Sequence, residues 1–137
     1  MAVDYGLRRL GVAVSDEGGS LARPLATITV KDGRDPVGAL MDLVRAESPG
    51  KVLVGNPRRL DGSPGTLFAA VTAFAGRLRE KIGVPVQMWD EGLTTIAAQE
   101  KLREAGASRR KRKAMADSAA AAVILQDFLD IGGGRKE

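Results

Sequence analysis

Four acidic residues stand where the chain otherwise has the pattern of a buried core. Asp4 ends the first apolar segment, Asp90 and Glu91 follow the apolar segment 84–89, and Asp117 lies in a helical pattern near the carboxyl end. A carboxylate removed from water is costly unless it is protonated, paired or bound to a metal. Because ligand sites in open sheets form at the carboxyl ends of strands, we expect these acids to gather in one site.

The inward position of Asp117 is predicted by helical periodicity. At about 100° per residue, Asp117 falls on the apolar stripe of its helix. The stripe consists of Ala121, Ile124, Leu125 and Phe128. Asp127 and Asp130 fall outside the stripe, so we expect them in solvent.

Clustered carboxylates repel one another, and a hard divalent cation between them removes the repulsion. The chain has no cysteine and no histidine, which excludes thiolate chemistry, zinc sites of thiolate or imidazole, and mechanisms with an imidazole base. Mg²⁺ or Mn²⁺ accepts oxygen ligands alone. One or two such ions would suit the acids, and two ions about 3.5 to 4 Å apart can activate water and stabilise the leaving oxygen of a phosphodiester.

Each acid also has a simpler interpretation. Asp4 could bind the backbone amides of the turn 6–9, and the pair Asp90-Glu91 could be the solvated end of a strand. Asp117 could pair with Lys113, one helical turn earlier. The residue pattern leaves these alternatives open.

The basic residues are concentrated rather than spread evenly. The formal net charge is +4, and every residue from 109 to 113 is a lysine or arginine. Such a run is common on a solvated helix face, but its place one turn before Asp117 favours binding of a nucleic-acid backbone. The residues predicted to contact nucleic acid are Arg8, Arg9, Arg58, Arg59, Arg109, Arg110, Lys111, Arg112 and Lys113.

Alternating strands and helices must position these residues. Apolar periodicity and turn residues predict strands over 1–5, 10–15, 26–30, 51–55 and 85–89, and helices over 35–47, 67–82, 94–105 and 109–129. This order predicts one α/β domain over residues 1–131, with a mixed central sheet of five strands, the first three antiparallel and the others parallel, flanked by helices. We expect a disordered tail over 132–137 and, without a membrane span or secretory signal, a cytoplasmic location.

Four motifs, in order, resemble the YqgF/RuvX family. They are DYGLRRLGVAVSD from Asp4 to Asp16, VGNP from Val54 with DGS from Asp61, WDEGLTT from Trp89, and RKRK from Arg110 followed by Asp117. The resemblance runs from residue 3 to about residue 130. It implies an RNase H-like fold and a nuclease of the Holliday-junction resolvase type, with a role in maturing the 5′ end of the precursor of 16S ribosomal RNA.

The resemblance also implies which residues act. The family's acids correspond to Asp4, Asp90, Glu91 and Asp117, the four that the residue pattern singles out. We expect Asp4, Glu91 and Asp117 to hold the metal, with Asp90 less direct because adjacent strand residues point to opposite faces. The implied partner is structured RNA or branched DNA, and the choice between them, the number of metals and a homodimeric state stay open.

The chain departs from the family pattern at several positions. Gly92 stands where the family usually has arginine, and Asn56 stands where it usually has leucine. Arg58 and Arg59 follow where the family commonly has polar or apolar residues, and would supply substitute phosphate contacts. Only three residues precede Asp4, where family members generally have several more.

Two other function classes fit part of the sequence. An actin-like nucleotide-binding module shares the Asp-x-Gly turn, although Leu7 stands where such ATPases usually have threonine or serine. A non-catalytic RNA- or ribosome-binding module would keep the basic residues without the chemistry, and the absence of the usual arginine at Gly92 favours it.

Overall fold

The computed structural model describes residues 1–30, 35–56, 68–90 and 109–131, with the backbone alone at residues 56, 90 and 109–116. Its elements are β1 (Ala2–Asp4), β2 (Arg9–Ser15), β3 (Ala22–Thr29), α1 (Val37–Glu47), β4 (Val52–Asn56), α2 (Phe68–Ile82), β5 (Val86–Asp90) and α4 (Arg109–Asp130). The predicted helix over 94–105 and the predicted disordered tail lie outside the described residues. No helix among the described residues combines the length and the apolar character needed to cross a membrane.

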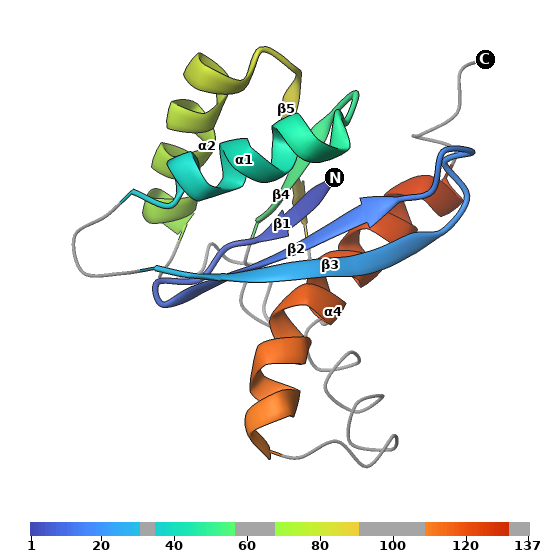
Figure 1. Cartoon of the computed structure of the whole chain (residues 1–137). Helices are drawn as coiled ribbons and strands as arrows, with labels where there is room; N and C mark the ends of the chain where they lie inside the picture. The colour runs from blue at the N-terminus through green and yellow to red at the C-terminus, as the bar shows by residue number, and fades with distance from the viewer. Residues whose placement is uncertain (31–34, 57–67, 91–108, 132–137) are drawn as a thin grey trace.

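The five strands form one mixed sheet in the order β3-β2-β1-β4-β5 (Figure 1). The pairs β1–β2 and β2–β3 are antiparallel, whereas β1–β4 and β4–β5 are parallel. The predicted α/β class, strand number and strand directions are therefore confirmed. β1 is central, and its carboxyl end lies beside the carboxyl ends of β4 and β5.

Helices cover both faces of the sheet: α1 and α2 lie on one face and α4 crosses the other (Figure 1). Side chains alternate between these layers along each strand. In β1, Val3 packs toward α1 and α2, whereas Ala2 packs toward α4, and both are fully buried. The sheet thus has a separate apolar core on each face.

The helix predicted over 67–82 corresponds to α2. Val71, Phe74 and Leu78 are fully buried on this helix, at the spacing expected of an amphipathic helix, and Ile82 is partly buried against the same core. Leu67, the first residue of the predicted helix, lies outside the described residues. Asp35 precedes α1 and accepts a hydrogen bond from the Val37 N–H at 3.1 Å, which stabilises the start of that helix.

The third strand starts earlier than predicted. β3 begins at Ala22 instead of residue 26, and Pro24 lies within it. Proline is tolerated because β3 is an edge strand, where one side of the backbone has no ladder partner. The register between β2 and β3 shifts at Val12 and Ala13, so the alternation of apolar residues that predicts a strand is interrupted there.

Candidate active site

Asp4 is the last residue of β1 and lies at the carboxyl end of the parallel strands. Ala2, two residues earlier, packs in the core beneath α4, so Asp4 is on the α4 face by strand alternation. Its side chain is half-buried, whereas Ala2 and Val3 are fully buried. The first acid is therefore at the rim of the core, where substrate and water can reach it.

Gly11 brings the second acid to the same place. Gly11 lies directly opposite Asp4 in the β1–β2 register. A Cβ atom at Gly11 would overlap the backbone carbonyl of Asp117 and lie 2.6 Å from the nitrogen of Ser118. Glycine is therefore required here, because the backbone of α4 lies directly on β2.

The convergence of Asp4 and Asp117 follows from these two contacts with Gly11. Asp117 is 25% exposed at the rim of the apolar stripe. The stripe residues Ala121, Ile124, Leu125 and Phe128 are buried, as predicted. Asp127 and Asp130 are exposed, also as predicted. The structure thus brings two of the four candidate acids to one rim of the sheet.

Arg9 is bound to Asp117 by a short ion pair. Its Nε donates to Asp117 Oδ2 at 2.7 Å, between residues 108 positions apart in the chain. Arg9 and Gly11 are two residues apart in β2 and therefore lie on the same face of the strand. Arg9 is thus beside the point where α4 contacts β2. The side chain of Lys113, the alternative partner suggested by helical spacing, is not among those described.

Asp90 is placed by its backbone alone. It is the last residue of β5 and is paired with Asn56, the last residue of β4. Since Val3 is level with Val54 in the neighbouring parallel strand, β1, β4 and β5 end at one edge of the sheet. Asp90 therefore ends β5 at the same end of the sheet at which Asp4 ends β1.

The structure describes only some of the other predicted site residues. Arg8 is exposed in the turn between β1 and β2. The basic residues Arg109, Arg110, Lys111, Arg112 and Lys113 form the first positions of α4, on the amino side of Asp117. Glu91, Gly92, Arg58 and Arg59 lie outside the described residues.

The acids suit a hard divalent ion by their chemistry. Asp4 and Asp117 offer carboxylate oxygens, and Oδ1 of Asp117 accepts no hydrogen bond within the described part of the chain. Mg²⁺ commonly takes one or two carboxylates and completes its octahedron with water and substrate phosphate oxygens. Among the residues described, no three acids form a metal-binding group, so Asp4 and Asp117 are the two candidate ligands whose side chains the structure describes.

A cavity of about 760 Å³ lies at the opposite end of β1 and α4, away from the acids. Its lining includes Met1, Lys51, Leu53, Leu125 and Phe128. Burial lowers the pKa of the Met1 amino group to about 6. Neither Asp4 nor Asp117 lines this cavity.

Two residues gain a role that sequence reasoning did not assign. Gly11 was part of a recognised motif without a stated function, and Arg9 was predicted only as a nucleic-acid contact. A glycine inside an otherwise apolar strand is itself a signal of close backbone approach. The Arg9–Asp117 pair had no comparable local signal.

Comparison with known proteins gives consistent matches along the whole chain. A family model described as "RuvX: Holliday junction resolvase" matches residues 1–131. A protein of Syntrophus aciditrophicus named "Putative pre-16S rRNA nuclease" is 44% identical over 130 residues, covering 95% of this chain and 87% of the relative. A protein of Moorella thermoacetica with the same name is 43% identical over 130 residues, covering 95% and 93%.

A solved structure shares the fold at lower identity. It is T. thermophilus RuvC in complex with a Holliday junction substrate, with a TM-score of 0.58 and 20% sequence identity, covering 97% of this chain and 95% of that one. The RNase H-like fold expected from the sequence is thereby confirmed.

Proposed function

This chain belongs to the RuvX family of Holliday junction resolvases, and from that premise we propose that it is a divalent-metal-dependent nuclease acting on structured nucleic acid. The candidate substrates are pre-16S rRNA, which the names of the relatives give, and a four-way DNA junction, as in the RuvC complex with a Holliday junction substrate. Within pre-16S rRNA, the 5′ end is the region that the sequence resemblance implies. With either substrate the proposed reaction is phosphodiester hydrolysis, at the rim of the sheet where Asp4 and Asp117 lie.

The observation that carries the proposal is the meeting of Asp4 and Asp117 around Gly11. An acid in the interior of a helix, on the stripe that packs against the sheet, contributes nothing to the core. Its position is explained if the carboxylate binds a cation together with Asp4. The absence of cysteine and histidine leaves carboxylates as the donors, which favours Mg²⁺ or Mn²⁺.

Each part of the site has a distinct task in this proposal. Asp4 and Asp117 hold the ion, with Glu91 as the third ligand implied by the family motif and Asp90 beside it. The bound ion would supply activation of water and stabilisation of charge on the leaving oxygen. Arg8, Arg58, Arg59 and the basic start of α4 contact phosphates and set affinity without reading sequence.

The test compares three single-acid variants in one cleavage assay. Asp4→Asn and Asp117→Asn are expected to lower cleavage of labelled pre-16S leader RNA or of a four-way DNA junction by at least about 100-fold in Mn²⁺, because each removes a metal-binding charge. Asp127→Asn is the matched control, since Asp127 is an exposed acid on the same helix, and is expected to stay within about two-fold.

Equal cleavage by all four proteins would identify a contaminating nuclease and reject the proposal. Binding of nucleic acid by the wild type without any cleavage, in either metal and with either substrate, would instead favour the non-catalytic binding module. Comparing the two substrates in the same experiment also decides between RNA and DNA.

A further inference from the structure

The ion pair between Arg9 and Asp117 lies at the rim where substrate would bind. The Arg9 side chain is 36% exposed and that of Asp117 is 25% exposed. The contact is therefore accessible to a large anion, while the 2.7 Å distance between Nε and Oδ2 shows that the two charges are engaged. The pair is partly buried, and the water that reaches both side chains screens the charges and limits the contribution of the pair to stability.

Both partners have capacity left for other ligands. A guanidinium carries five N–H donors, and Nε is the Arg9 donor that is bound within the described residues. The donors on the two terminal nitrogens match the oxygens of a phosphate. Asp117 likewise keeps Oδ1 for a cation.

The charge of Arg9 acts against a metal ion at this site. A divalent ion held by Asp117 would lie within a few ångströms of the guanidinium, and like charges at that separation repel. In the absence of nucleic acid, Arg9 partly neutralises the acids and thus lowers the affinity for metal. A phosphodiester bound to Arg9 would neutralise the guanidinium in turn and relieve this repulsion.

We propose that Arg9 is shared between Asp117 and a phosphate of the substrate, so that nucleic acid and divalent ion bind cooperatively. This rests on the proposed function, and it extends that function by assigning Arg9 a coupling role. Because binding free energies are linked reciprocally, the ion strengthens nucleic-acid binding by the same factor as nucleic acid strengthens ion binding. Ions would then accumulate at the acids mainly when a substrate is in place.

The chain contains a closely matched control pair. Arg77 Nε donates to Asp35 Oδ2 at 2.8 Å, and the two side chains are 42% and 38% exposed. This pair joins Asp35, two residues before the start of α1, to α2, on the face of the sheet opposite α4. Arg77→Gln therefore removes a similar charge and a similar contact away from the acids.

The experiment measures Mn²⁺ affinity by the electron paramagnetic resonance signal of free Mn²⁺, with and without a synthetic four-way DNA junction or a hairpin RNA. Intactness of the nucleic acid is checked on a denaturing gel. For the wild type, nucleic acid is expected to tighten Mn²⁺ binding about 10-fold. Arg9→Gln is expected to bind Mn²⁺ about 10-fold more tightly than wild type without nucleic acid. It is expected to gain less from nucleic acid than the wild type does, because only direct contact between the ion and phosphate oxygens remains.

Two further variants serve as controls. Arg77→Gln is expected to match wild type in both conditions. Arg9→Lys keeps the positive charge but lacks the planar guanidinium group. In the absence of nucleic acid it is expected to bind Mn²⁺ as the wild type does. It is expected to lose part of the coupling between Mn²⁺ and nucleic acid. Circular dichroism and thermal melting check that each variant is folded, and Arg9→Lys provides the comparison if Arg9→Gln is not.

The possible results separate this inference from the proposed function. If Arg9→Gln binds Mn²⁺ as wild type does, or more weakly, and keeps the coupling while Asp117→Asn is inactive, the shared role of Arg9 is wrong and the nuclease assignment stands. If wild type binds no Mn²⁺, or Asp117→Asn cleaves normally, the proposed function itself fails.

Discussion

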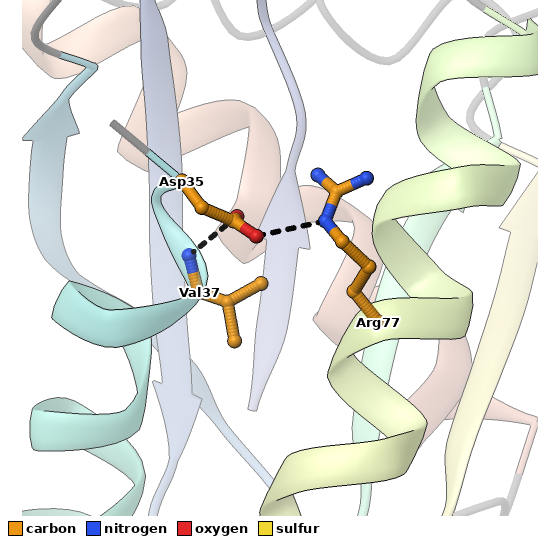
Figure 2. A network of polar contacts seen from close by, with 3 residues as sticks. All are labelled: Asp35, Val37 and Arg77. Carbon is orange, nitrogen blue, oxygen red and sulfur yellow. Dashed lines mark hydrogen bonds and ion pairs between the residues drawn. The ribbon is translucent and has the colours of Figure 1, made fainter. Parts of the chain in front are cut away.

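Two ion pairs of nearly the same length join remote parts of this chain, and they differ in their surroundings. In each, an arginine Nε donates to an aspartate Oδ2, at 2.8 Å for Arg77–Asp35 and at 2.7 Å for Arg9–Asp117. Figure 2 shows the first pair, in which Asp35 also accepts the backbone N–H of Val37. Arg77 in addition lies over the Phe74 ring of its own helix. The pair therefore joins the start of α1 to α2, and each partner has a further contact beside it.

The second pair lacks this local support. Asp117 lies inside α4, where the backbone N–H groups are already bonded within the helix, and Arg9 is its hydrogen-bond partner within the described residues. An alanine at position 117 would suit the helix and its buried stripe better than an acid. The comparison indicates that the surroundings of an ion pair, rather than its length, reveal whether it belongs to the scaffold or to the chemistry.

The largest expected effect comes from the glycine beneath Asp117. Gly11→Ala would force α4 away from β2, because the added Cβ overlaps the backbone of Asp117. We expect the free energy of unfolding to fall by about 3 kcal/mol, measured by urea denaturation. Cleavage activity should fall together with stability, since the two acids separate.

Gly38→Ala is the control on the scaffold side. Gly38 lies in α1, and nothing is within 4 Å of a Cβ added there. Its replacement should raise stability by about 0.5 to 1 kcal/mol through helix propensity. An equal loss of stability in both variants would show that the close approach at Gly11 is not what positions α4.

Replacing Asp35 should change stability without changing cleavage, whereas replacing Asp117 should change cleavage with little effect on stability. Asp35→Ala removes an acceptor for the Val37 N–H and the partner of Arg77, and should cost about 1 kcal/mol of stability with cleavage unchanged. Asp117→Ala trades a partly exposed ion pair for better helix propensity, so its stability should stay within about 0.5 kcal/mol of wild type. Its cleavage activity should be lost.

Urea denaturation and the cleavage assay, applied to both variants, check this pair of outcomes. A large loss of stability in Asp117→Ala, comparable with that of Gly11→Ala, would contradict the distinction and make the Arg9–Asp117 pair a structural contact.

The smallest expected effect is a pH dependence of the stability that Asp35 contributes, at the contact between the start of α1 and α2. Burial alone would raise the pKa of Asp35, but the Val37 N–H and the Arg77 guanidinium outweigh it, so the pKa lies below its ordinary value of 3.8. The stabilisation by Asp35 is therefore fully present above the unfolded-state pKa and is lost as the pH falls through the lower folded-state pKa. The stability difference between wild type and Asp35→Ala should be constant from about pH 7 to about pH 5 and shrink below about pH 4.

Denaturation curves of both proteins across this range provide the measurement. If the stability difference between wild type and Asp35→Ala grew as the pH fell, the pKa of Asp35 would be raised rather than lowered by folding, and the proposed stabilisation of its carboxylate would be wrong.

Local patterns were sufficient for most of the scaffold. The apolar spacing in α2 identified Val71, Phe74 and Leu78 as core residues, because a helix that packs on one face repeats at a fixed angle. The start of β3 was missed because Pro24 normally argues against a strand, and its tolerance depends on the strand lying at the edge of the sheet. Edge position is a property of the assembled sheet, so no local pattern encodes it.

By itself the sequence determined the class of chemistry and the alternating elements. With no cysteine or histidine, carboxylates are the ligands available, and the helical period already put Asp117 on a buried stripe. Only the tertiary structure decided that Asp4 and Asp117 lie beside Gly11, and that Arg9 is bound to Asp117. The physical reason is that these contacts depend on strand register and on the path of α4 across the sheet, which join residues far apart in the chain.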